Sequence, residues 1–139
     1  MSEIYSFNAV MYTVGTQISL EKLVGTEVTV ALRNTESSAD VRYFHGVISY
    51  LESKGMRTSA SDVVEQYIDY HATIVPAISF LKKRTNCRIY QNKTSLKIVS
   101  ELLNEHKVAF KDQTTKSYEK NDYCVQYQES DLDFIDRLL

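Results

Sequence analysis

The run Cys124-Val-Gln-Tyr-Gln-Glu-Ser-Asp-Leu-Asp-Phe-Ile-Asp-Arg-Leu-Leu139 decides the fold of the second half of this chain of 139 residues. Its first part alternates between two faces and predicts a strand. One face carries Tyr123, Val125 and Tyr127, and the other carries Cys124, Gln126 and Gln128. Ser130 is then predicted to cap a helix, with Asp133 at the reciprocal position of a capping box and Asp131 at the positive end of the helix dipole. Because no glycine or proline closes this helix before Leu139, we expect it to continue in a longer protein.

Upstream of this run, the sequence predicts further short elements of a small α/β part. Lys93–His106 has the strongest helical pattern, with Thr94 or Ser95 as its N-cap. A shorter helix is predicted at Ala77–Lys83, with Pro76 at its start. The remaining expected segments are an extended stretch at Arg88–Gln91, a brief strand at Val108–Phe110 and a polar loop at Gln113–Asn121.

The first half of the chain predicts antiparallel strands joined by short connections. The predicted strands are Tyr5–Val14, Glu27–Arg33, Val41–Glu52 and Val63–Val75, with a short helix at Thr16–Leu23 and connections at 34–40 and 53–62. Val63–Val75 alternates well, and its apolar face is Val64, Ile68, Tyr70, Ala72 and Ile74. Val41–Glu52 is apolar on both faces, and Gly46 in its middle permits a bend or a bulge at a barrel corner.

These elements together predict a mainly β, α+β chain. Residues 1–91 are expected to form a partial antiparallel β-barrel, and residues 92–139 an α/β connector that is truncated at its end. Ten tyrosines against five phenylalanines suit the strands of a thin barrel, and they also suit protein–protein interfaces.

Three motifs of this chain resemble those of the VgrG family, the spike proteins of the bacterial type VI secretion apparatus. The motifs are Leu23-Val-Gly-Thr-Glu-Val-Thr-Val30 with Arg42-Tyr-Phe-His-Gly-Val-Ile48, then Arg88-Ile-Tyr-Gln91 with the helix behind it, and finally the Cys124–Leu139 run. They occur in the family's order and cover nearly the whole chain. Family members carry more strand before the segment matched by Phe7–Leu23 and continue into a second barrel and a β-helical needle, so the chain resembles a fragment of the hub region.

The resemblance implies a structural role without enzymatic activity. It implies a first barrel like the tail-hub barrels of contractile phages and a homotrimeric ring in the full-length protein. The implied partners are a second and third copy, the secretion tube protein, and effector and tip proteins that would be held by a C-terminal part. The hub or baseplate protein of a contractile prophage tail is the alternative. A small cell-wall hydrolase and a ligand-binding barrel are further alternatives from other functional classes.

Composition excludes several other classes of partner. The formal net charge is −2 and the isoelectric point is about 5.9, so the chain is not expected to bind nucleic acid. No apolar run reaches the length of a membrane span, and the start of the chain has no basic segment or long apolar core of a secretory signal. We therefore expect a cytoplasmic protein, whose parent would be exported by the type VI apparatus.

The sequence predicts no catalytic, cofactor-binding or metal-binding residues. His45, His71 and His106 are scattered and are interpreted as a strand-corner, a solvent-facing and a helix-end residue. Cys87 and Cys124 are too few for a disulfide framework and are interpreted as reduced thiols, with a disulfide between them as the alternative. An acidic cluster formed by Glu129, Asp131, Asp133 and Asp136 starts like a calcium loop but lacks its glycine, so helix capping is the preferred interpretation.

Overall fold

The computed structural model describes residues 4–33, 41–58 and 66–139. The chain divides into two compact units, Glu3–Pro76 and Ala77–Leu139, and each unit is described by itself. The sequence prediction had placed the division between residues 91 and 92. In the structure, the strand around Arg88–Gln91 pairs with the strand that precedes the last helix, so it packs within the second unit.

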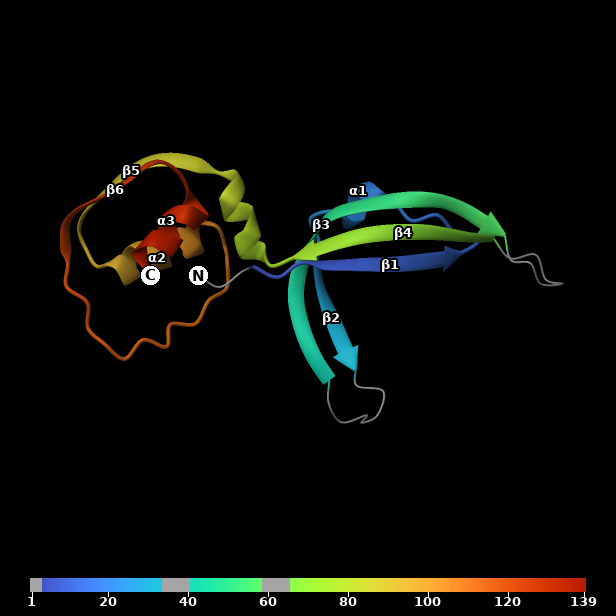
Figure 1. Ribbon diagram of the computed structural model, residues 1–139, viewed down its shortest axis with the longest axis horizontal. Coiled ribbons are helices and arrows are strands. Elements are labelled where there is room, and N and C mark those ends of the chain that lie inside the picture. The colour runs from blue at the N-terminus through green and yellow to red at the C-terminus, as the bar shows by residue number, and fades with distance from the viewer. Residues whose placement is uncertain (1–3, 34–40, 59–65) are drawn as a thin grey trace. The chain divides into compact units, whose positions relative to one another are not determined.

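The Glu3–Pro76 unit is an antiparallel sheet of four strands with one short helix (Figure 1). In chain order its elements are β1 (Phe7–Val14), α1 (Leu20–Leu23), β2 (Glu27–Arg33), β3 (Val41–Thr58) and β4 (Gln66–Val75). The strands lie side by side in the order β1-β4-β3-β2, and every pairing is antiparallel. The predicted mainly β, antiparallel architecture is confirmed, although β3 continues to Thr58 through part of the segment predicted as a connection.

Strand β3 is long because it pairs with a different neighbour along each half. Its first half pairs with β2, its second half pairs with β4, and Val47 is the residue shared by both registers. Figure 1 shows the resulting bend: β2 and the first half of β3 turn away from the direction of β1 and β4. A single strand thus forms a corner of the sheet.

A β-bulge explains why the sequence of β3 is apolar on both faces. The register shifts between Ile48 and Tyr50, which leaves Ser49 as the extra residue. Without the shift, Ile48 and Leu51 would lie on opposite faces of the strand. Because of the shift, both point into the core, whereas Tyr50 is exposed. The expected bulge is therefore present, but it lies three residues after Gly46.

Gly46 itself marks a close approach between strands. A Cβ atom added to Gly46 would lie 2.7 Å from Cγ2 of Ile74 and 2.9 Å from the carbonyl oxygen of Val75. The absence of a side chain therefore allows the end of β4 to lie close against β3 at the corner.

The core of this unit lies on the inner face of the bent sheet, where α1 and its flanking residues cover it. Its buried residues are Ile48, Leu51, Ile68, Tyr70, Ala72 and Ile74. The predicted apolar face of Val63–Val75 is confirmed for the described positions, while Val64 lies outside them. Tyr70 is fully buried, and its hydroxyl accepts a hydrogen bond of 3.1 Å from the backbone N–H of Ile18.

No barrel closes within residues 4–33, 41–58 and 66–76. The two outer strands of the sheet, β1 and β2, do not pair with each other. The outer sides of β1 and β2 are therefore free edges, as expected for a partial barrel.

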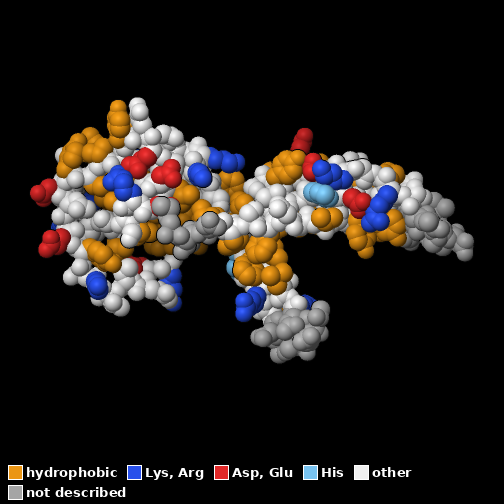
Figure 2. Space-filling view, in the orientation of Figure 1, with side chains coloured by type: hydrophobic (Ala, Val, Ile, Leu, Met, Phe, Trp, Pro, Cys, Tyr) orange, Lys and Arg blue, Asp and Glu red, His pale blue; other side chains and the backbone are white. Residues whose placement is uncertain are grey.

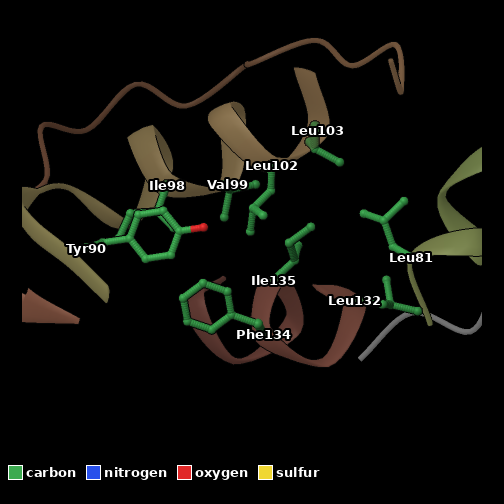
Figure 3. Packing of buried hydrophobic residues seen from close by; sticks show 9 residues of the cluster. All are labelled: Leu81, Tyr90, Ile98, Val99, Leu102, Leu103, Leu132, Phe134 and Ile135. Atoms are coloured by element: carbon green, nitrogen blue, oxygen red, sulfur yellow. The ribbon is translucent and has the colours of Figure 1, made fainter. Parts of the chain in front are cut away.

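The Ala77–Leu139 unit places two helices against one face of a two-stranded sheet. Its elements are the 3₁₀ helix η1 (Ala77–Lys83), β5 (Thr85–Lys93), α2 (Ser95–Glu105), β6 (Asn121–Ser130) and α3 (Asp131–Leu138). Figure 3 shows side chains of η1, β5, α2 and α3 meeting in one core. This core consists of Leu81, Tyr90, Ile98, Val99, Leu102, Leu103, Leu132, Phe134 and Ile135.

Helix α2 ends in a Schellman motif, and this corrects the strand predicted at Val108–Phe110. Lys107 adopts a positive φ of 55°, and the Val108 N–H donates to the Leu103 carbonyl at 2.9 Å. The Lys107 N–H also donates to the carbonyl of Asn104. Val108 is therefore the residue that closes the helix and packs on the core, and its apolar character reflects that role.

Both predicted helix caps are confirmed. Thr94 Oγ1 accepts a hydrogen bond from Lys97 N–H at 3.1 Å, and Ser130 Oγ accepts one from Asp133 N–H at 3.1 Å. The Ser130 hydroxyl also donates to Asp133 Oδ2 at 2.6 Å. The Asp133 carboxylate thus binds the hydroxyl of Ser130, whereas in a capping box it would bind the backbone N–H of Ser130.

Candidate functional site: free sheet surfaces and a buried polar node

The outer strand β1 is a free edge that carries none of the usual protection. Its sequence Phe-Asn-Ala-Val-Met-Tyr-Thr-Val contains no charged residue, glycine or proline. Natural sheets commonly protect an edge with lysine, proline or a bulge, because unpaired backbone groups invite another strand. On the outer face of β1, Val10, Tyr12 and Val14 are 71%, 62% and 52% exposed. This edge is therefore suited to pairing with a further strand.

The opposite edge of the same sheet, β2, differs from β1. It begins and ends with the charged residues Glu27 and Arg33, and its apolar Leu32 is 48% exposed. Strands β1 and β2 are therefore two unlike free edges, and each half of β3 also has one side without a strand partner among the described strands. Because β1 and β2 differ, the β1 edge of one copy can pair with the β2 edge of another.

The second free surface is the outer face of the two-stranded β5–β6 sheet. Ile89 is 61%, Tyr123 58% and Tyr127 70% exposed, although alternation groups them as an apolar face. The inward face instead carries Gln126, which is fully buried, and Cys124, which packs against the core. The sequence predicted the two faces correctly, but the more polar one lies inside.

Gln126 lies inside because it belongs to a polar node centred on the carboxylate of Asp131. Asp131 Oδ1 accepts hydrogen bonds from Gln126 Nε2 at 2.7 Å and from Asn86 Nδ2 at 2.9 Å, and His106 Nε2 lies 2.8 Å from Oδ2. The Asp131 backbone N–H donates to the carbonyl of Arg84. The side chain of Asp131 is fully buried. The node therefore ties the start of α3 to β5, β6 and the end of α2.

A second, more exposed ion pair lies beside the node. Arg88 donates to both carboxylate oxygens of Glu105, at 2.6 and 2.9 Å. This bidentate contact is the main reason that the pKa of Glu105 is lowered. For Asp131, burial raises the pKa, but the hydrogen bonds from Gln126, Asn86 and His106 together lower it below the usual value.

The lowered pKa of Asp131 predicts acid sensitivity of the second unit. A carboxyl group with a depressed folded-state pKa stabilises the fold above its unfolded pKa, about 3.9, and this stability is lost as the pH falls through the folded value. We expect the urea midpoint of the Ala77–Leu139 unit to fall as the pH drops below about 4. In Asp131→Ala the same titration should be flatter, and an unchanged slope would contradict this assignment.

The other residues considered in the sequence do not converge on one site. His45 Nδ1 lies 2.9 Å from Thr29 Oγ1 and the residue is exposed, and its carbonyl accepts a hydrogen bond from Tyr5. His71 is exposed, as predicted. Cys87 and Cys124 are free thiols, the first exposed and the second half-buried.

The acidic cluster of the last run is divided among different contacts. Glu129 forms an ion pair with Arg137 at 2.6 Å, Asp131 lies in the node and Asp133 holds the cap. Among the described residues no group of three or more His, Cys, Asp or Glu side chains is placed to hold a metal ion. In the described part of the chain, no helix has the length and apolar character that crossing a membrane requires.

The node is the feature that sequence reasoning missed. Asp131 was interpreted through the helix dipole and His106 as a helix-end charge, whereas the structure brings both together with Asn86 and Gln126. The four residues come from four different elements. The sequence of β6 places Gln126 on a regular strand but does not signal that its side chain is buried.

Comparison with known proteins identifies the class of this fold. The family model for the phage tail baseplate hub (GPD) matches residues 1–139. The type VI secretion system spike protein VgrG1c of Pseudomonas aeruginosa is 28% identical over 140 residues, which cover all of this chain and 18% of that protein. The actin cross-linking toxin VgrG1 of Vibrio cholerae is 32% identical over 127 residues, covering 87% of this chain and 10% of the toxin.

A solved structure shows the same fold. The E. coli c3393 protein is described as a component of the type VI secretion system with structural similarity to the T4 bacteriophage tail proteins gp27 and gp5. It matches with a TM-score of 0.73 and 25% identity, over 99% of this chain and 36% of that one.

These findings define the class of the fold, which is that of the tail-hub proteins, and the chain is similar to type VI secretion spike proteins. The chain belongs to the phage tail baseplate hub (GPD) family. It spans about a fifth of the length of the VgrG1 relatives of Pseudomonas aeruginosa that it matches over its full length.

Proposed function

We propose that this chain is part of the hub of a type VI secretion spike and that its work is assembly, without catalysis. The observation that carries this is the unprotected edge β1, in a chain that matches secretion spike proteins along its full length. A sheet with an uncharged, apolar free edge gains from strand pairing, because each new strand satisfies backbone donors and acceptors.

The two unlike edges favour a closed ring. Pairing of β1 in one copy with β2 in the next is a head-to-tail contact, and head-to-tail contacts close into rings when the rotation allows it. We propose a homotrimer for the full-length protein, in keeping with the hub family. In the chain alone, the same edges would either join copies or be filled by another segment of the chain.

The partners we propose follow from this role. The ring would dock on the secretion tube protein, and effector and tip proteins would be held by parts of the parent protein that relatives carry beyond the matched fifth. We propose neither nucleic acid nor membrane as a partner, and we propose synthesis in the cytoplasm with export of the parent through the type VI apparatus.

A hub protein of a contractile prophage tail is the second candidate, because the matching family model describes phage tail baseplate hubs. The two roles use the same fold and differ in the tube on which the hub docks. Neighbouring genes separate them: tube and sheath genes of a secretion system support the first role, and capsid and terminase genes support the second.

Binding to the tube protein tests the proposed function directly. The purified chain would be mixed with the tube protein encoded beside it, and binding would be measured by sedimentation velocity. Double replacement Val10→Lys/Tyr12→Lys introduces charge on β1 and should weaken binding at least tenfold, because the ring that the tube recognises would not form. Lys22→Glu, on the exposed helix α1, is the control. Equal binding by all three proteins, or by none, would contradict the proposal.

A further inference from the structure

We propose that Tyr5 covers an open side of β3 and so keeps second copies of this chain from pairing with that strand. Strand β3 pairs with β2 from Val41 to Val47 and with β4 from Val47 onward. The side of Val41–Gly46 that faces away from β2 therefore has no strand partner among the described strands. We call this side the β3 notch, because it lies in the angle where β2 and the first half of β3 bend away from β1 and β4 (Figure 1).

The register of β2 and β3 determines which backbone groups the notch presents. The Ile48 N–H donates to the carbonyl of Thr26 at 3.1 Å, so the backbone groups of Ile48 face β2. These groups alternate between the two sides of an antiparallel strand, so the even-numbered residues before Ile48 also face β2. Three residues therefore turn their N–H and C=O groups toward the notch: Val41, Tyr43 and His45. A row of such donors and acceptors is what an added strand requires.

Tyr5 occupies part of this notch. Its hydroxyl donates a hydrogen bond to the carbonyl of His45, which is one of the groups that an added strand would use. Its ring meets the ring of Phe44 edge-on, with centroids 5.9 Å apart, and its centroid lies 5.4 Å from that of Phe7. The centroids of Phe7 and Phe44 are 5.0 Å apart, so the three rings form one cluster. The cluster therefore holds the residues before β1 against the open side of β3.

The surroundings of the notch favour strand pairing if they are left uncovered. Figure 2 shows hydrophobic side chains gathered on the arm that β2 and the first half of β3 form. Arg42 is the only residue of Val41–Gly46 with a permanent charge, and this stretch contains no proline and no register shift with β2. An edge with so little charge and no bulge attracts further strands.

The second half of β3 is protected in a different way. It carries charged side chains such as Lys54, and its register with β4 shifts at two places. Charged side chains and bulges are usual means by which an edge avoids unwanted pairing. In the first half, the ring and hydroxyl of Tyr5 take their place. Strand β1 has no protection of either kind, so the chain closes the notch and leaves open the edge that the proposed assembly uses.

The choice of β1 as the assembly edge rests on the proposed function, whereas the cover on β3 does not. If β1 is not the assembly edge, Tyr5 still closes the notch. Every comparison is therefore made in the Val10→Lys/Tyr12→Lys protein, in which charge closes the β1 edge. A failure of tube binding and a failure of the cover are then separate results.

Removal of the cover should let the notch pair with other copies. In the Val10→Lys/Tyr12→Lys protein, the added change Tyr5→Ala should raise the initial rate of association, followed by light scattering at about 100 µM, at least fivefold. The Tyr43 N–H points into the notch, so its exchange with solvent should slow at least tenfold in the associated protein. Tyr118→Ala removes an exposed tyrosine from the other unit and should leave the association rate unchanged.

Two lysine variants separate an opened edge from a general loss of stability. Added to the Tyr5→Ala protein, Tyr43→Lys places a charge at the notch and should return the association rate to its starting value. Tyr50→Lys places the same charge at an exposed position on the second half of β3 and should leave the raised rate in place. An unchanged rate after Tyr5→Ala, an unslowed Tyr43 amide or equal suppression by both lysines would overturn the proposal.

Discussion

Replacement of Asp131 by alanine is expected to destabilise the Ala77–Leu139 unit by about 4 kcal/mol. The change removes the carboxylate acceptor of the half-buried Asn86 amide and of the buried Gln126 amide, which keeps only its bond to the Glu129 carbonyl. It also leaves His106 without its carboxylate partner. Loss of one partner from a buried, hydrogen-bonded charged group is among the most costly single changes in a folded protein.

Asparagine at the same position should cost less, about 1–2 kcal/mol, because its amide oxygen can still accept from Gln126 and Asn86. Asp136→Ala, an exposed change on the same helix, should stay within about 0.5 kcal/mol. Urea-dependent unfolding, monitored by amide hydrogen exchange, assigns each change in stability to one of the two units. An Asp131→Ala protein within about 1 kcal/mol of the wild type would show that the node contributes little.

Replacement of Gly46 by valine is expected to destabilise the Glu3–Pro76 unit by about 3 kcal/mol. The new Cβ would lie 2.7 Å from Ile74 Cγ2 and 2.9 Å from Val75 O, and the second contact is with backbone that cannot rotate away. The corner where β3 exchanges β2 for β4 would have to open.

Ala31→Val is the matched control, because it adds the same kind of side chain to an exposed position of the neighbouring strand β2. It should change stability by less than about 0.5 kcal/mol. The diagnostic readout is exchange of the β3 amides near Ile48, which should accelerate in Gly46→Val alone. Unchanged exchange there would mean that the sheet accommodates the side chain by another route.

Local features of this fold were predictable from sequence because their physical causes are local. The caps at Thr94 and Ser130 depend on a hydroxyl next to free backbone N–H groups, and the inner face of β4 follows from alternation. Recognition of the hub family rested on motifs spread along the chain, and the family model matches that chain throughout.

Features that depend on distant residues were not predictable. The bulge at Ser49 moves Leu51 to the core, and no local pattern signals where a register shifts. The node requires contacts among Asn86, His106, Gln126 and Asp131, whose approach is set by the fold. For the same reason alternation predicted the faces of β6 but could not say that Gln126 would be buried and Tyr127 exposed.

The central claim is that the free edge β1 builds this chain into an assembly. Light scattering coupled to size exclusion, at about 20 µM, tests it most directly. For the wild type we predict a mass of three times 16.0 kDa, and for Val10→Lys/Tyr12→Lys the mass of one chain. A wild-type chain that elutes with the mass of one chain, and whose β1 amides exchange freely, would contradict the account.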